Sequence, residues 1–461
     1  MLRRGDFIKV GWDGMGNVRS QLAQSLAYFN GYVYLGVTHH AGHGPQDCAR
    51  ILRLTPGTCD WEVMFTSPLV EADERAAAQD TMRKMMRAGN MDFQTEEMVP
   101  LYRGIRNLTV FQSPTDAYPA LYAGTISNWG AHVLRSEDGV NFEVVSEAGM
   151  GNDSIMSFRS LVPFKGRMFA APTGTATDKG FDRNLRSDPT VYVSSDPARG
   201  DWQAANEPGF GDERNIAITR LAVFNDHLYA SVTNPYRGFE LWKTTAEGEP
   251  PFQWSRVLEC GAYRNNLNEM APTMEAFGDA LYVGSGIAGL GYDPEHDVGP
   301  AAAELIRVRA DDSWDLIMGT HRATPDGYKK PISGEGPGFN EQYNSVIWSM
   351  AEHNGCFYVG THQVETWVAA FRPGLSDGGG GFHLWATEDG DNWEAVSLDG
   401  FGNRYMYGIR SFVSTPQGLY FGTANNYMKM RRRRGGRFAE QAEVEEDPNL
   451  NTGAEVWLGQ P

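Results

Sequence analysis

One short strand pattern recurs seven times along the chain, and it constrains the fold more than any other feature. Each copy has an apolar residue, an aromatic or second apolar residue, another apolar residue and then a small residue. The copies lie at 33–36, 121–124, 168–171, 228–231, 281–284, 357–360 and 419–422. Most copies follow a tight-turn pair such as Asn30-Gly31 or Gly278-Asp279, which is typical of a β-hairpin. A chain of repeated hairpins indicates one repeated all-β architecture, not a set of unrelated domains.

The last strand of each repeat completes the pattern. Six repeats carry an aromatic anchor there, at Trp61, Phe142, Trp202, Trp254, Trp314 and Trp393. The seventh repeat stops at its third strand, 456–458, while residues 5–10 read like 391–396. We therefore predict an all-β fold: a single seven-bladed β-propeller, residues 1–461, in which the N-terminal strand at 5–10 completes blade 7 and removes the free sheet edges.

Two turns carry a family resemblance. The segments 136–142 and 387–393 share the order Ser or Thr, Glu, Asp, Gly, any residue, Asn, aromatic. They resemble a shortened form of the Asp-box of sialidase-like propellers. In that family the box is a structural turn between the third and fourth strands, so the resemblance implies a fold and not a site. Asp-box sialidases have six blades, and the remaining catalytic pattern of that family is not found in this sequence.

Charge and motif content narrow the function classes. Lys and Arg number 40 and Asp and Glu 58, so the net charge is −18, which disfavours nucleic acid or an anionic membrane as a partner. No Walker motif, Rossmann unit or CxxCH is present, so no nucleotide, flavin or haem is expected. The four cysteines show no CxxC spacing, and no signal peptide is found. These features predict a cytoplasmic protein with free thiols.

The connections between strands are unequal in length. The long ones are all of the type that joins the second strand to the third, or one blade to the next, and these share one face of a propeller. They run over 39–49, 66–104, 173–189, 287–303, 319–344, 363–381 and 425–452. Residues 72–87 are rich in Ala, Met, Arg and Glu, which predicts a helical insertion at about 71–89 that is either a lid or a packing helix. Function is expected on this face.

Polar residues end most of the second strands. Because blades 6, 7 and 1 are neighbours in a closed ring, His362, Gln363, Asn425, His39 and His40 are expected to form one arc at the mouth of the central channel. Histidine suits proton transfer and metal binding. We predict His39, His40 and His362 as catalytic candidates, and His39, His43 and His362 as candidate ligands of a divalent metal. The alternative is that these side chains cap strand ends.

Arginines and aromatic residues complete the candidate site. Arg106, Arg159 and Arg410 occupy equivalent positions in first strands, with Arg220 one position away. They would clamp a carboxylate, or pair with Asp and Asn of the loops between blades. The other predicted ligand-binding residues are polar or aromatic and lie in the long loops or at their start. They are Trp129, Asn234, Tyr236, Gln363, Trp367, Asn425 and Tyr427.

Taken together, these features predict an intracellular enzyme that acts on a polar, anionic small molecule or sugar acid. The expected chemistry is that of a lyase, isomerase or hydrolase, with histidine or a metal assisting. The resemblance in architecture is to cytosolic propeller lyases that degrade uronic-acid sugars. The alternative function is a binding propeller without catalysis, either lectin-like or a protein scaffold. The strong differences between the loops of different blades favour one asymmetric site.

Overall fold

The protein is described by a computed structural model over residues 1–39, 44–73, 97–175, 185–187, 189–371, 374–376, 378–427 and 453–461. The fold is all-β and mostly antiparallel, as predicted. The α-helices of the described residues are short: α1 (Asp13–Gly16), α3 (Cys260–Tyr263), α4 (Ala288–Gly291) and α5 (Glu365–Phe371). In these ranges no helix has the length and apolar character needed to cross a membrane.

Antiparallel pairing joins most strands in groups of four. The groups from the first half of the chain are β2 (Leu22–Phe29), β3 (Tyr32–Thr38), β4 (Arg50–Leu54) and β5 (Trp61–Thr66); β8 (Gly104–Phe111), β9 (Ala120–Ile126), β10 (Val133–Ser136) and β11 (Glu143–Val144); and β12 (Ile155–Phe164), β13 (Arg167–Thr175), β14 (Tyr192–Ser194) and β15 (Gln203–Ala204). Next come β16 (Ala217–Phe224), β17 (His227–Thr233), β18 (Glu240–Thr244) and β19 (Ser255–Leu258); and β20 (Met270–Phe277), β21 (Ala280–Gly286), β22 (Leu305–Arg309) and β23 (Trp314–Met318).

Two further groups follow, and the second of them draws on both ends of the chain. They are β26 (Asn344–His353), β27 (Cys356–Gln363), β28 (Leu384–Thr387) and β29 (Glu394–Ser397); and β30 (Met406–Thr415), β31 (Gly418–Asn425), β32 (Val456–Gly459) and β1 (Phe7–Gly11). In the pairing of β1 with β32, Phe7 lies opposite Gly459 and Lys9 opposite Trp457. The ladders do not make one closed sheet, since β16–β19 form a sheet of their own.

Two small ladders lie outside these groups: β6 (Leu69–Glu71) with β7 (Met98–Pro100), and β24 (Arg322–Thr324) with β25 (Gly327–Lys329). The β6–β7 ladder overlaps the start of the helical insertion that the sequence predicts at about 71–89. Glu71 belongs to strand β6, where it pairs with Met98, so the insertion begins with β-structure. Residues 74–89 lie outside the described residues.

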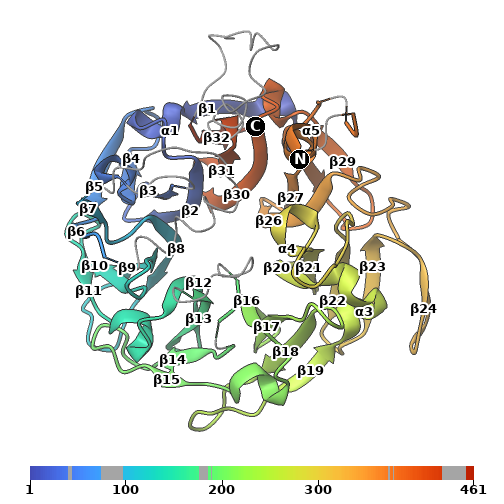
Figure 1. The fold of residues 1–461 in the computed structure, drawn as a ribbon, viewed down its shortest axis with the longest axis horizontal. Helices are drawn as coiled ribbons and strands as arrows, with labels where there is room; N and C mark the ends of the chain where they lie inside the picture. The colour runs from blue at the N-terminus through green and yellow to red at the C-terminus, as the bar shows by residue number, and fades with distance from the viewer. Residues whose placement is uncertain are drawn as a thin grey trace.

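The first strand of each group faces the centre of the molecule (Figure 1). We call these strands, β2, β8, β12, β16, β20, β26 and β30, the inner strands. Each contacts the inner strand of the next group, and β30 contacts β2. Side chains that leave an inner strand toward the centre therefore meet side chains from several groups.

The recurring aromatic of the second strand explains why the groups pack together. Tyr34, Tyr122, Tyr229 and Tyr420 are all fully buried. Apolar clusters join neighbouring groups: one of them holds Phe169 of β13 together with Leu221 and Leu228 of the next group. Since each aromatic ring removes roughly 150–250 Å² from water, the core is a series of shared interfaces between groups.

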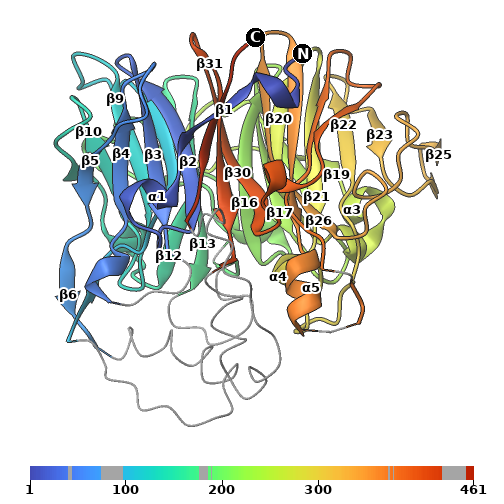
Figure 2. The same cartoon turned by 90° about the horizontal axis from the view of Figure 1, so that it is seen from above.

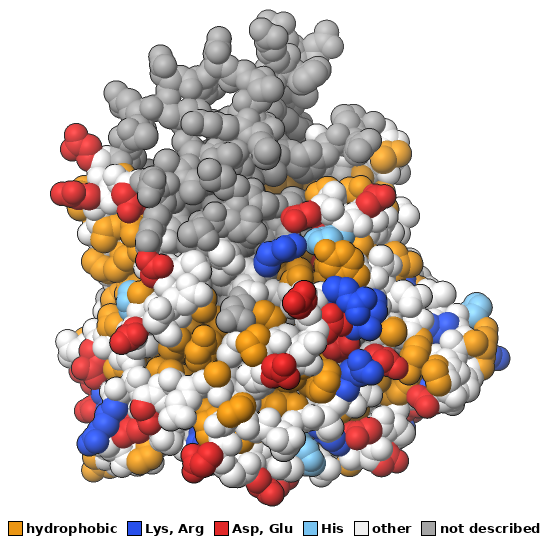
Figure 3. Space-filling view, turned by 60° about the horizontal axis from the view of Figure 1, so that its bottom comes forward, with side chains coloured by type: hydrophobic (Ala, Val, Ile, Leu, Met, Phe, Trp, Pro, Cys, Tyr) orange, Lys and Arg blue, Asp and Glu red, His pale blue; other side chains and the backbone are white. Residues whose placement is uncertain are grey.

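The two faces of the molecule differ. The helices α4 and α5 and the strand β6 lie on one face, and both chain termini lie on the other (Figure 2). The described parts of three long connections, 66–104 with β6, 287–303 with α4 and 363–381 with α5, thus share a face. On the side shown in Figure 3, acidic side chains are interspersed with basic and apolar ones.

Two tight turns between third and fourth strands have the same hydrogen bonds. Asp389 Oδ1 accepts the backbone N–H groups of Asp391 (2.9 Å) and Asn392 (2.8 Å), and the Asn392 amide donates to Asp389 Oδ2 at 2.7 Å. Asp138 holds its own turn in the same way. Each turn also docks its glycine against a buried tyrosine hydroxyl: a Cβ at Gly390 would overlap Tyr282.

We expect Asp389→Ala to lower the free energy of unfolding by about 1 kcal/mol at pH 7, because backbone N–H groups lose a charged acceptor. These hydrogen bonds hold the pKa of Asp389 below its usual range. The carboxylate therefore stabilises the fold above the unfolded-state pKa, and the contribution is lost as the pH falls. Urea unfolding at pH 7 and pH 3 measures this effect. Asp60→Ala is the control, and an equal loss in both variants contradicts the prediction.

Candidate functional site

All seven inner strands contain a β-bulge at the same level, where the register with the second strand shifts by one residue. A bulge bends the strand and re-aims a side chain. The bulged residues are Gln24, Arg106, Arg159, Thr219, Ala271 with Pro272, Trp348 and Arg410. The three predicted arginines are thus bulge residues, and Arg220 directly follows the bulge of β16.

Arg106, Arg159, Arg220 and Arg410 form what we call the central arginine cluster. Burial lowers the pKa of every member. Repulsion among the members adds to this: Arg410 and Arg220 help to lower the pKa of Arg159 to about 9, and Arg220 helps to lower that of Arg410 to about 10. The ordinary pKa of arginine in water is above 12. The lowered pKa values therefore mean that the surroundings of the cluster disfavour positive charge.

Several other partly buried arginines of the described residues are neutralised by carboxylates, whereas Arg50 donates to the Met15 and Gly14 carbonyls and to Ser20 Oγ. Arg19 is bidentate with Asp47 at 2.6 and 2.7 Å, and Arg322 lies 3.0 Å from Glu304. Arg135 binds Glu143 at 2.6 Å and also contacts Asp116. The members of the central arginine cluster form no ion pair with any described carboxylate. The Nε atoms of Arg106, Arg159 and Arg220 are shielded from solvent and make no hydrogen bond.

Arg410 links the cluster to the predicted catalytic histidine. Its guanidinium lies 4.8 Å from the centre of the Trp348 ring. With the Gln24 amide turned so that its oxygen faces Arg410, this oxygen accepts from Nη2 at 2.6 Å and from Nε at 3.0 Å. The His362 ring meets Trp348 edge-on at 4.6 Å, and Ser345 Oγ lies 3.0 Å from His362 Nδ1. His362 and Arg410 therefore both contact the same indole ring.

A carboxyl group also lies among the inner strands. Glu275 of β20 makes no hydrogen bond to the described residues, and burial raises its pKa to about 7, with Arg220 lowering it and Glu352 raising it. The sequence does contain a signal for this residue. Glu275 pairs with Tyr282, and the residues opposite the recurring aromatic elsewhere are uncharged: Ala27, Thr109, Val162, Ala222, Ala351 and Val413.

His39 differs from its predicted role. Its ring is buried, with Nδ1 at 2.8 Å from the Arg19 carbonyl and Nε2 at 3.0 Å from the Cys48 carbonyl. Both ring nitrogens are therefore engaged by the backbone, which leaves neither for a substrate or a metal. His40 and His43 lie outside the described residues, and those residues contain no group of three His, Cys, Asp or Glu side chains arranged to hold a metal.

The polar residues at the ends of the second strands share a structural contact. Each side-chain oxygen accepts the backbone N–H two residues later. Asn234 binds Tyr236 N (3.1 Å), Gln363 binds Glu365 N (2.9 Å) and Asn425 binds Tyr427 N (2.8 Å). Such contacts start turns. The recurrence of polar residues here is therefore explained by turn formation, and ligand binding is not needed to account for it.

The predicted aromatic residues separate into two kinds. Trp367 and Tyr427 are buried and pack with Tyr405 and Val364. Tyr236 is 55 % exposed and Trp129 is half-buried, with its indole N–H donating to Asp73 Oδ2 at 3.1 Å. Only the second pair offers a ring to a ligand in this arrangement.

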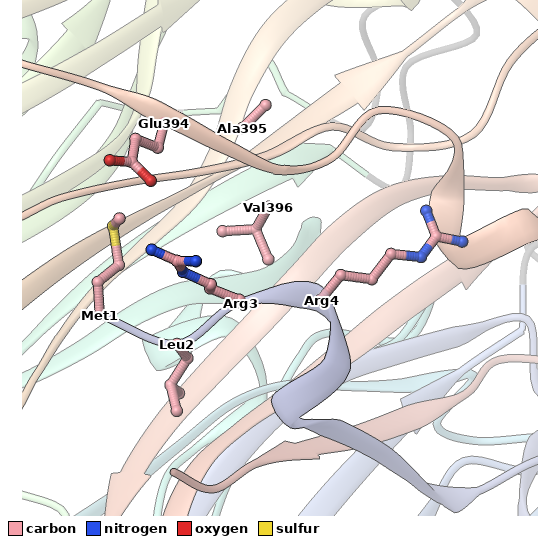
Figure 4. A pocket seen from close by; sticks show the side chains of 7 residues that line it. All are labelled: Met1, Leu2, Arg3, Arg4, Glu394, Ala395 and Val396. Carbon is pink, nitrogen blue, oxygen red and sulfur yellow. The ribbon is translucent and has the colours of Figure 1, made fainter.

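A small pocket of about 350 Å³ lies away from these residues. It is formed by the first four residues and by Glu394, Ala395 and Val396 (Figure 4). The N-terminus lies on the face opposite α4 and α5 (Figure 2). None of the predicted site residues lines this pocket.

No family model and no curated protein matches the chain. Among solved structures, the chain is similar to the GH93 alpha-L-arabinofuranosidase of Fusarium graminearum in complex with arabinobiose. The identity is 11% and the TM-score 0.39, covering 78% of this chain and 94% of that one. It is also similar to U3-55K, with 11% identity, TM-score 0.47 and 100% of both chains covered. A third is CoXyl43, a GH43 beta-xylosidase/alpha-arabinofuranosidase from a compost microbial metagenome, with 13% identity, TM-score 0.31, and 60% and 86% covered. Likenesses this distant do not assign a function.

Proposed function

We propose that the chain is a seven-bladed propeller, completed by β1, whose central channel binds an anionic small molecule or sugar acid and acts on it as an enzyme. The pairing of β1 with β32 and the contacts between successive inner strands support the architecture. A single domain over 1–461 follows from the same proposal.

The central arginine cluster carries the functional proposal. The four guanidinium groups are partly buried and form no ion pair with a described carboxylate, and only Arg220 has a carboxyl group, that of Glu275, close enough to affect its pKa. Such a concentration of positive charge is unfavourable unless a ligand brings the missing negative charge. A carboxylate or similar anion would accept bidentate hydrogen bonds from the guanidinium groups. The net charge of the chain is −18, so this concentration of positive charge runs against the composition of the whole molecule.

A reaction class follows from the neighbours of the cluster. An arginine-bound carboxylate makes removal of a proton from the adjacent carbon easier, because the developing negative charge is stabilised. His362, which contacts Trp348 as Arg410 does, is the proposed acid–base group. Lyases and isomerases use such a pair to remove a proton, and a hydrolase would use the histidine to activate water. We also propose a cytoplasmic location, because the four cysteines are free thiols.

Titration calorimetry with galacturonate and glucuronate tests the proposal, with the neutral sugars galactose and glucose as ligand controls. We expect the uronates to bind and the neutral sugars not to bind. Arg159→Gln is expected to weaken uronate binding about 100-fold, the order expected for losing a buried charged contact. Arg214→Gln, at an exposed arginine, is the protein control. Proton NMR of the mixtures reports turnover. Binding without turnover favours the binding propeller, and no anion binding contradicts the proposal.

A further inference from the structure

The loop between β21 and β22 contains a histidine–aspartate pair. His296 Nδ1 lies 2.7 Å from Asp293 Oδ2, and the two side chains are only 8 % and 0 % exposed. The other oxygen, Asp293 Oδ1, accepts the backbone N–H groups of Glu295 (2.8 Å) and His296 (3.3 Å). The carboxylate is thus fixed by its own turn, and it holds the proton of the imidazole on Nδ1.

This arrangement leaves the second ring nitrogen available. His296 Nδ1 is hydrogen-bonded to Asp293, whereas His296 Nε2 makes no hydrogen bond to the described residues. Tyr236 meets the imidazole edge-on at 5.1 Å and is itself 55 % exposed. A neutral imidazole with Nδ1–H on a carboxylate carries its lone pair on Nε2, which is the arrangement of a proton acceptor.

The loop begins beside three inner strands, one of which carries a member of the arginine cluster. Ala288 of α4 belongs to one apolar cluster with Ala217 of β16, the strand of Arg220, with Met270 of β20 and with Trp348 of β26. Trp348 in turn stacks on Arg410. Farther along the loop, Glu295 lies 3.5 Å from Arg186 of the loop after β13. The pair is therefore held between these two anchors, on the face that carries α4 (Figure 2).

We propose that Asp293 and His296 form a second proton-transfer pair for the anionic ligand. His296 Nε2 accepts a proton from a hydroxyl or activated C–H group of the ligand, and the bonding electrons stay on the ligand. The imidazolium keeps Nδ1–H on Asp293 and returns the Nε2 proton when the product forms. His296 is the catalytic residue and Asp293 the positioning residue. The inference rests on the proposed function, because it needs an anion at the arginine cluster.

Acylation by diethyl pyrocarbonate, mapped by mass spectrometry on the full chain, tests the pair because the reagent attacks unprotonated ring nitrogens. His296 should react, and saturating galacturonate should slow its acylation at least fivefold, whereas galactose should not. The exposed His321 is the internal control and should react equally in all samples. An unchanged rate at His296 while calorimetry shows galacturonate bound overturns the pair and leaves the proposed function intact. No galacturonate binding overturns both.

The role of Asp293 is tested by the tautomer of His296, measured by long-range proton–nitrogen NMR of the imidazole in the full chain. In the wild type the ring proton should lie on Nδ1, because the Asp293 carboxylate accepts it. In Asp293→Asn this preference for Nδ1–H should be lost, and Glu295 and Arg186 are unchanged in this variant. An unchanged tautomer means that Asp293 only shapes the loop.

Discussion

Arg159→Gln is expected to make the unliganded protein more stable while it weakens anion binding. The guanidinium is half-buried, has no carboxylate partner, and is repelled by Arg410 and Arg220. Removing one of several like charges relieves both desolvation and repulsion. We expect the free energy of unfolding at pH 7 to rise by about 1–2 kcal/mol, as sites kept for function often cost stability. Urea unfolding without added polyvalent anions measures it.

Arg135→Gln is the matched control for this prediction. Arg135 is buried more fully than Arg159, with its side chain 8 % exposed, but it contacts Asp116, which is 2 % exposed, and binds Glu143 at 2.6 Å. Its loss leaves a buried carboxylate unpaired, and such a loss costs about 3–5 kcal/mol. The two variants should therefore move stability in opposite directions. If both destabilise the fold alike, the central arginines are structural and the functional account is wrong.

Glu275→Gln is expected to stabilise the protein at pH 8 and to have little effect at pH 5. Burial raises the folded-state pKa of Glu275 from the ordinary 4.5 to about 7. Between these values the folded state holds a proton that the unfolded state has released, so wild-type stability falls as the pH rises. The amide stays neutral and avoids this loss. At about 1.4 kcal/mol per pKa unit, this shift makes the gain in unfolding free energy above pH 7 on the order of 3 kcal/mol.

Urea unfolding of the wild type and of Glu275→Gln at pH 5, 6, 7 and 8 measures how the free energy of unfolding of each depends on pH. Glu394→Gln, at an exposed glutamate of β29, is the control and should show no such trend. A Glu275→Gln variant that is destabilised at pH 8 would mean that the ionised carboxylate is needed by the fold, against the burial described here.

The strand repeat was predictable because its signal is local. A hairpin turn followed by a buried aromatic and a small residue marks each second strand, and the alternation of side chains fixes which residues face the core. The same alignment placed Arg106, Arg159 and Arg410 at one level of the inner strands. It did not reveal that each of them is a bulge residue, because a bulge depends on the register between two strands and leaves no fixed mark in one sequence.

The histidine arc was harder to predict for a different reason. A polar side chain at a strand end can stabilise a turn or bind a ligand. Only its hydrogen-bond partners in the folded protein distinguish these two roles. His39 has both nitrogens on carbonyl groups, and Asn425 caps the turn at Tyr427. The pair of Asp293 and His296 was missed. Its signal is the spacing Asp-Pro-Glu-His within a long loop, which is weak without the fold.

Anomalous diffraction from crystals soaked in selenate tests the central claim most directly, because selenium locates a bound dianion without assumptions about the natural ligand. The account predicts that the strongest anomalous peak lies between Arg106, Arg159, Arg220 and Arg410, and that it disappears in Arg159→Gln. Peaks confined to exposed arginines such as Arg214, with none at the cluster, would contradict the account.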